Sequence, residues 1–320
     1  MSMGKGMLSF LSVRRESGWM SVLPLGDRIG LAHVVRGTGV RPEIRMLDSF
    51  RVEGSVAASL SRLCVARRLK TYACTTLMAM GDYALSQIDA PNVPPAERKE
   101  AVRWALKGLV DYPVDRACID VLDIPMDGGG AGRQASVFAV SAAEGVVQAR
   151  ARVFDEAKVP LAVIDIPELA QRNVAALFED ENRGLAFLRL DEAGGLLTLT
   201  FHGELIAARR VDVSATQLAD GDSGRQTQAM ERLVLDLQRS LDNFDRQYSF
   251  IPISKLVVAA YPPVEDLASS LAENLYVPVV PMDLAQVMDF SAVPELREPE
   301  CQAMNLLLIG AALRTGEVAA

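Results

Sequence analysis

The sequence predicts a mixed α/β protein with two half-domains, each of which begins with a β-hairpin. Residues 184–212 give the clearest evidence, because three short apolar strands are separated there by turns at Gly194-Gly195 and His202-Gly203. Glycine adopts positive φ without steric hindrance and therefore favours such turns. A fainter hairpin spans 19–35, with its turn at Gly26-Asp27. Strands and helices follow both hairpins, which is typical of α/β folds.

Apolar spacing predicts the other elements of the first half. Repeats every three or four positions indicate helices, and runs of β-branched and aromatic residues indicate strands. The expected strands are 42–52, 71–80, 117–124, 134–140 and 161–166, and the expected helices are 56–69, 96–110, 141–157 and 167–178. Ser141 and Glu144 have the spacing of a capping box, so that helix is expected to begin at Ser141.

An acidic segment at 179–181 marks the boundary between the halves, which are therefore predicted as 1–182 and 183–320. The elements expected after the second hairpin region are a long helix at 227–248, a strand at 255–260, a helix at 263–275, a strand at 277–280 and a helix at 300–314. This last helix is apolar on nearly every side, so we expect it to pack back between layers of the fold.

Composition excludes several classes of protein. The chain has 320 residues, 50% of them hydrophobic and 23% charged, which fits about two globular domains. A net charge of −8 and a pI near 5.0 do not favour nucleic-acid binding. No secretion signal is evident, and the longest apolar run, 304–313, is too short to span a membrane.

Cysteine and histidine usage indicates neither disulfides nor a metal site. The four cysteines lack the spacing of disulfide or zinc motifs, so we expect reduced core thiols: Cys64, Cys74, Cys118 and Cys301. Neither His33 nor His202 has a second His or Cys at ligand spacing, and no metal is therefore expected.

A glycine-rich run at 128–132 invites comparison with a phosphate-binding loop. Such a loop should lead into a helix, whose free N–H groups hold the anion. This run leads instead into the strand expected at 134–140, and no Lys-Ser or Lys-Thr pair follows it. We therefore interpret it as a hairpin turn.

Several passages resemble the PilM family of type IV pilus assembly proteins, and in particular its MSHA-pilus branch. The most specific spans 87–125 and contains QIDAPNVPPAE, AVRW and DYPV; weaker support comes from 237–259 and 306–314. The resemblance extends from Trp19 to the end of the chain. It implies an actin-like (ribonuclease-H-like) ATPase fold, with a small subdomain inserted at about 73–158.

The resemblance also implies where nucleotide motifs should lie, and this chain departs from them. Actin-like ATPases place an Asp-x-Gly in each of two phosphate hairpins. In the first, Gly26 is retained and the acid is absent, although Asp27 is adjacent; in the second, Arg189 replaces the acid and Asp191 the glycine. At the adenosine loop, Ala260 stands where glycine is usual, and Tyr261 and Pro262 would occupy the space of an adenine ring.

These departures predict that ATP hydrolysis and tight nucleotide binding are lost, with no catalytic residue and no required cofactor. ATP and Mg²⁺ remain implied by the resemblance alone. A shift of the motifs by one or two residues is the alternative, and it would offer Asp27, Asp191 and Glu192 to a metal. If nucleotide binding is lost, we expect Arg189 to pair with an acid across the cleft between the halves.

The function that the resemblance implies is a cytoplasmic scaffold at the inner membrane, held there by partner proteins. It would bind the cytoplasmic tail of a PilN-like single-span protein in a groove near the inserted subdomain. Trp104 is a candidate anchor for that partner, or else packs within the subdomain. The alternatives are an active or nucleotide-switched ATPase, including a sugar-kinase-like enzyme, and an actin-like component of type II secretion.

Overall fold

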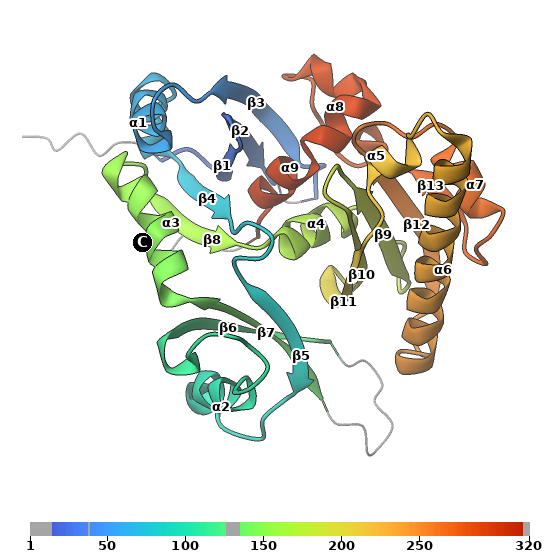
Figure 1. Cartoon of the computed structure of the whole chain (residues 1–320). Coiled ribbons are helices and arrows are strands. Elements are labelled where there is room, and N and C mark those ends of the chain that lie inside the picture. The colour runs from blue at the N-terminus through green and yellow to red at the C-terminus, as the bar shows by residue number, and fades with distance from the viewer. Residues whose placement is uncertain (1–14, 38, 126–134, 316–320) are drawn as a thin grey trace, which may run out of the picture.

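The computed structural model describes residues 15–37, 39–125 and 135–315, and it arranges their strands in three sheets (Figure 1). Two sheets have five strands each and the third has three. The prediction of a mixed α/β fold in which each large sheet starts with a hairpin is confirmed.

The first large sheet has the strand order β3-β2-β1-β4-β8. Its strands are β1 (Trp19–Leu25), β2 (Arg28–Val35), β3 (Glu43–Arg51), β4 (Ala73–Leu77) and β8 (Leu161–Asp165). β1, β2 and β3 pair antiparallel, whereas β4 runs parallel to β1 and to β8. The predicted turn at Gly26-Asp27 is confirmed, since Leu25 pairs with Arg28 and Gly26 has a φ of 57°.

The second large sheet repeats this plan in the order β11-β10-β9-β12-β13. Its strands are β9 (Gly184–Leu190), β10 (Gly195–Phe201), β11 (Glu204–Val211), β12 (Ile253–Ala260) and β13 (Val279–Pro281). The turn at His202-Gly203 forms as predicted, with φ values of 52° and 75°. The first turn, however, consists of 191–194, because Gly195 already pairs with Leu190 in the strand.

The third sheet has the order β5-β7-β6, and its strands lie between β4 and β8 in the sequence. They are β5 (Ala84–Asp89), β6 (Ala117–Asp123) and β7 (Ser136–Ala143). The glycine-rich run at 128–132 lies outside the described residues, and the strands on either side of it pair antiparallel. Sequence analysis missed β5, which has few fully apolar positions and is only partly buried.

Most predicted helices form with shorter bounds. The exceptions are the long helix predicted at 227–248, which begins earlier at Ser223, and a short helix at Ala215–Leu218, which was not predicted. Among the described residues the helices are α1 (Val56–Ala66), α2 (Arg98–Ala105), α3 (Glu144–Glu156), α4 (Pro167–Ala175), α5 (Ala215–Leu218), α6 (Ser223–Gln247), α7 (Leu267–Ala272), α8 (Pro299–Met304) and α9 (Leu306–Ala312). Short 3-10 helices occupy Leu69–Thr71, Pro95–Glu97, Val114–Arg116, Leu284–Gln286 and Pro294–Arg297.

Two helix predictions were wrong in detail. Ser141 does not cap a helix: it lies in β7 between Ala84 and Ile119, and its hydroxyl is 2.8 Å from that of Tyr112. Pairing on both sides holds Ser141 in the sheet, and α3 begins only at Glu144. The final apolar helix is broken at Asn305 into α8 and α9, and only α9 is buried along most of its length.

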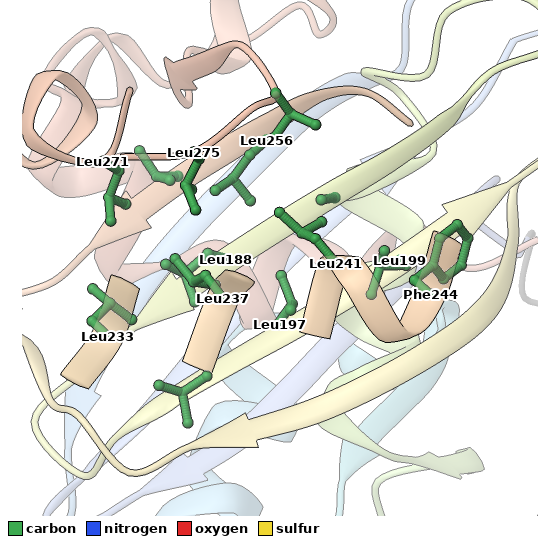
Figure 2. Packing of buried hydrophobic residues seen from close by; sticks show 14 of the residues in the cluster. Leu188, Leu197, Leu199, Leu233, Leu237, Leu241, Phe244, Leu256, Leu271 and Leu275 are labelled. Atoms are coloured by element: carbon green, nitrogen blue, oxygen red, sulfur yellow. The ribbon is translucent and has the colours of Figure 1, made fainter. Parts of the chain in front are cut away.

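The long helix α6 covers one face of the second sheet. Figure 2 shows the side chains through which helix and sheet pack: Leu233, Leu237, Leu241 and Phe244 from α6, and Leu188, Leu197 and Leu199 from β9 and β10. All seven are buried, so this cluster is the core of the second half.

Two helices, α4 and α9, join the halves by packing between the large sheets. α9 lies against β1 and β2, α4 lies against β10, and the two helices contact each other. Asn173 Nδ2 donates to the Gly310 carbonyl at 2.9 Å, and Ser21 Oγ donates to the Leu308 carbonyl at 2.6 Å. A Cβ on Gly310 would lie 2.1 Å from the Ala170 carbonyl oxygen, so only glycine permits this close approach.

Gly310→Ala is expected to destabilise the fold by about 2–4 kcal/mol or to prevent folding, because the methyl group would overlap backbone of α4. The free energy of unfolding in urea measures the effect. Gly145→Ala is the matched control, since nothing lies within 4 Å of its Cβ position in α3. The control should leave stability unchanged or raise it by up to about 1 kcal/mol. Equal unfolding midpoints for both variants would contradict the close contact.

Candidate functional site: a cleft between the two halves

A cleft of about 670 Å³ is lined by residues from the first hairpin turn of each large sheet. Leu25 and Gly26 come from the β1–β2 turn, and Asp191 and Glu192 from the β9–β10 turn. The remaining walls are formed by the β4–β5 link, by α3, by the segment after β12 and by α8 with α9. This volume is within the usual range of small-molecule sites in proteins.

The first turn presents apolar groups and a glycine to the cleft. Leu25 is 55% exposed there, and a Cβ on Gly26 would meet nothing within 4 Å. Asp27, predicted at a nucleotide motif, is not among the residues that line the cleft. Its carboxylate lies 3.7 Å from Arg51 Nε, and both side chains are well exposed.

The second turn is closed by Asp191. Its Oδ1 accepts hydrogen bonds from the backbone N–H of Ala193 at 2.8 Å and of Gly194 at 3.1 Å. Its Oδ2 accepts from Arg189 Nη1 at 2.5 Å. Both carboxylate oxygens are thus engaged within one turn, by the residues that shape it.

The prediction that Arg189 pairs with an acid across the cleft was wrong. The partner of Arg189 is Asp191, two residues away on the same turn, because this nearer carboxylate lies within its reach. The Arg189 side chain is only 12% exposed, and its Nε is buried without a partner in the part of the chain described here. The guanidinium therefore depends on Asp191 for compensation of its charge.

The predicted adenosine-loop position lies beside this turn. Ala260 ends β12 opposite Leu190, and Tyr261 N donates to the Leu190 carbonyl at 3.0 Å. The structure thus brings Arg189, Asp191 and Ala260 to one end of the second sheet. Tyr261 lines the cleft, whereas Ala260 lines a neighbouring hollow beside Asp266.

Sequence analysis did not find the apolar walls of the cleft. Met80, from the link after β4, and Met304 and Leu307, from α8 and α9, line it together with Leu25. Met80 and Met304 are exposed, although large apolar side chains are usually buried. Met80 lies in the link that leads into the third sheet, and Met304 lies just before the helix break at Asn305. Neither feature was predicted from the sequence.

The described residues contain no cluster of three side chains suited to a metal ion. His33 is a core residue whose Nε2 lies 2.8 Å from the Ser17 carbonyl oxygen, and burial lowers its pKa. Cys64 and Cys74 are buried free thiols, and burial raises the pKa of Cys74 to about 12. Cys118 is exposed on β6 and was wrongly predicted as a core thiol, because alternate side chains of that strand face outward.

Trp104 is on the outer side of the inserted sheet. Val102 of α2 and Leu106, directly after it, pack against that sheet, whereas Trp104 is 65% exposed. Lys107 Nζ lies 5.5 Å from the centre of the indole ring. Leu109 falls within the helix expected at 96–110, but α2 ends at Ala105 and Leu109 is exposed.

No protein family model matches this chain, and no curated protein matches it in sequence. A chain of the PilM–PilN type IV pilus biogenesis complex superposes with a TM-score of 0.71 and 20% identity, over 94% of this chain and 98% of that one. The cytoplasmic domain of EpsL, an inner membrane component of the type II secretion system of Vibrio cholerae, gives a TM-score of 0.47 at 13% identity, over 95% of this chain and 100% of its own. The superposition on the chain of the PilM–PilN complex shows the fold: mixed α/β and actin-like ATPase in type, with two ribonuclease-H-like sheets and a small third sheet.

Asp191→Ala is expected to lower the free energy of unfolding by about 1–2 kcal/mol, because it leaves Arg189 and two turn N–H groups without their acceptor. Glu192→Ala, in the same turn and with the same loss of charge, should change stability by less than about 0.5 kcal/mol. Urea titrations of both variants test this. Equal losses would show that Asp191 has no special role in the turn.

Proposed function

We propose that this protein is a PilM-like assembly scaffold of a type IV pilus machine, and that it binds the cytoplasmic tail of a PilN-like single-span protein. The observation that carries the proposal is the superposition on a chain of the PilM–PilN complex over nearly the full length of both chains. The motif-rich passage 87–125, which contains the end of β5 and all of α2 and β6, supports it from the sequence. The MSHA-type assignment is the finer part of the proposal and rests on this passage.

The organisation that we propose follows the two hairpins. Residues 1–182 form one actin-like half and 183–320 the other, and the inserted subdomain, predicted at about 73–158, contains the third sheet. β4 lies within that range but belongs to the first large sheet, since it pairs with β1 and β8. The last helix packs back against the first sheet, as the contacts of α9 with β1 and β2 support.

We further propose that the cleft does not serve as a site for Mg²⁺ and ATP. Two acids of the β9–β10 turn line the cleft, Asp191 and Glu192. The two oxygens of Asp191 are engaged by Arg189 and by the turn itself, which leaves Glu192 as the one acid of that turn open to a metal. Asp27 is directed toward Arg51, outside the cleft. A nucleotide-switched ATPase, the alternative, would need the Arg189–Asp191 pair to open, with the desolvation penalty of leaving Arg189 unpaired.

Among the described residues no helix combines the length and the apolar character needed to cross a membrane. We propose that the protein lies on the cytoplasmic face of the inner membrane and is held there by its single-span partner. Binding of other pilus assembly components would follow from the same scaffold role.

Co-purification tests the proposal. The tagged protein, isolated from gently solubilised membranes, should retain a single-span pilus protein, and deletion of that protein's cytoplasmic tail should abolish the association. Recovery of the protein alone, or an association that does not depend on the tail, would contradict the scaffold function.

Trp104→Ala tests the partner surface. If the exposed indole anchors the tail, affinity for a tail peptide should fall about tenfold or more, as for other tryptophan anchors. Val65→Ala is the matched control, because Val65 is an exposed apolar side chain on α1. Titration calorimetry gives both affinities. Equal affinities of the Trp104→Ala and Val65→Ala variants would exclude Trp104 from the interface, but they would not contradict the scaffold proposal.

A further inference from the structure

A second hollow lies on the outer side of the second half, between α6 and the segment that contains α7. Its volume is about 650 Å³. Figure 1 shows the two helices side by side at the edge of the molecule. The inner face of α6 packs into the core cluster of Figure 2, and the hollow is formed by the neighbouring stripe of this helix. In that stripe Met230 and Val234 are only partly buried against the core, and Leu235 lies outside it.

That stripe is regular. The residues of α6 that line the hollow recur every four positions and form two adjacent rows along the helix. One row is Gln226, Met230, Val234 and Gln238, and the other is Thr227, Glu231 and Leu235. At 1.5 Å per residue, the stripe is about 18 Å long, which makes the hollow a groove parallel to the helix axis. Gln238 Nε2 donates to the Asn274 carbonyl at 2.9 Å and bridges the two walls at one end.

The floor of the groove is apolar. Met230, Val234 and Leu235 form it from α6, and Val264 contributes from the other wall. Leu235 is 44% exposed, although it has the size and apolar character of a core residue. Apolar surface of this kind, at helical spacing, is the usual receptor for an amphipathic helix.

The rim of the groove is acidic. Glu231, Glu265 and Asp266 line it and are exposed, and no Lys or Arg is among the described residues that line it. Arg225, near one end, is within ion-pair distance of Asp220 and Asp222. The groove therefore presents uncompensated negative charge around an apolar floor, and this favours a cationic occupant.

We propose that this groove binds a basic amphipathic helix of a partner protein. Three to four turns of such a helix would match the length of the groove, with an apolar stripe on Met230, Val234 and Leu235 and with Lys or Arg side chains toward the acids. One wall is the helix α6 and the other is the segment before and through α7, so neither wall offers a strand edge to an extended peptide. A second copy would bring the same acidic rim, and like charges would oppose the pairing.

This site is independent of the proposed tail-binding surface. Trp104 is on α2 of the inserted sheet, whereas the groove belongs to the second half. A scaffold with two such surfaces would hold two partners at once, and loss of one surface should leave binding at the other unchanged.

The test uses the full-length protein and a fluorescein-labelled peptide of about 14 residues, made only of Leu and Lys, with its leucines at helical spacing. A scrambled peptide of the same composition lacks the apolar stripe. Fluorescence anisotropy should show saturable binding of the striped peptide, at least tenfold tighter than the scrambled one. Equal binding of the two peptides, or no saturable binding of the striped one, would overturn the proposal.

Variants then locate the site. Glu231→Lys should weaken binding of the striped peptide about tenfold at low salt, and Leu235→Gln about fivefold. The matched controls are Glu156→Lys, exposed at the end of α3, and Val65→Gln, exposed on α1; both should bind within about twofold of the parent protein. Thermal unfolding confirms that each variant is folded. Equal weakening by a groove variant and its control would place the peptide elsewhere and refute the site.

Discussion

The contact between α4 and α9 is the constraint on which the rest of the structure depends. Each helix packs against one large sheet, and they meet where Gly310 approaches the Ala170 carbonyl more closely than any side chain would permit. The hydrogen bond from Asn173 to Gly310 fixes this crossing. α4 follows β8 of the first sheet, and α9 is the last helix of the described residues. Their contact therefore holds the two large sheets, and the turns that line the cleft, in a fixed relation.

The same arrangement explains the character of the cleft. The walls of the cleft include Leu25, Met80 and Met304. Asp191 lines the cleft from the β9–β10 turn, and both of its carboxylate oxygens are engaged by neighbouring groups. These groups favour apolar contact over coordination of a hydrated cation and phosphate. The proposed scaffold role requires no chemistry in the cleft, only a stable relation between the halves and the surfaces on their outer sides.

Much of the fold could be predicted from the sequence, because the hairpin turns use glycine and the helices keep apolar spacing. What could not be predicted depends on tertiary contact. β5 is a strand because β7 pairs with it, Ser141 is in a strand because it has neighbours on both sides, and the last helix breaks at Asn305. Gly26 and Asp191, singled out from the sequence, do line one cleft, but the pairing of Arg189 with Asp191 was not predicted. The sequence gives no measure of which carboxylate a buried guanidinium reaches first.

We propose that this protein holds its partner without the help of nucleotide. Titration calorimetry of the full-length protein with the cytoplasmic tail of the proposed single-span partner, with and without saturating Mg²⁺ and ATP, tests this directly. The same affinity is expected in both conditions, with no heat from ATP alone. An affinity that changes by tenfold or more on addition of Mg²⁺ and ATP would contradict the proposal, and would show that the Arg189–Asp191 turn opens to admit a nucleotide.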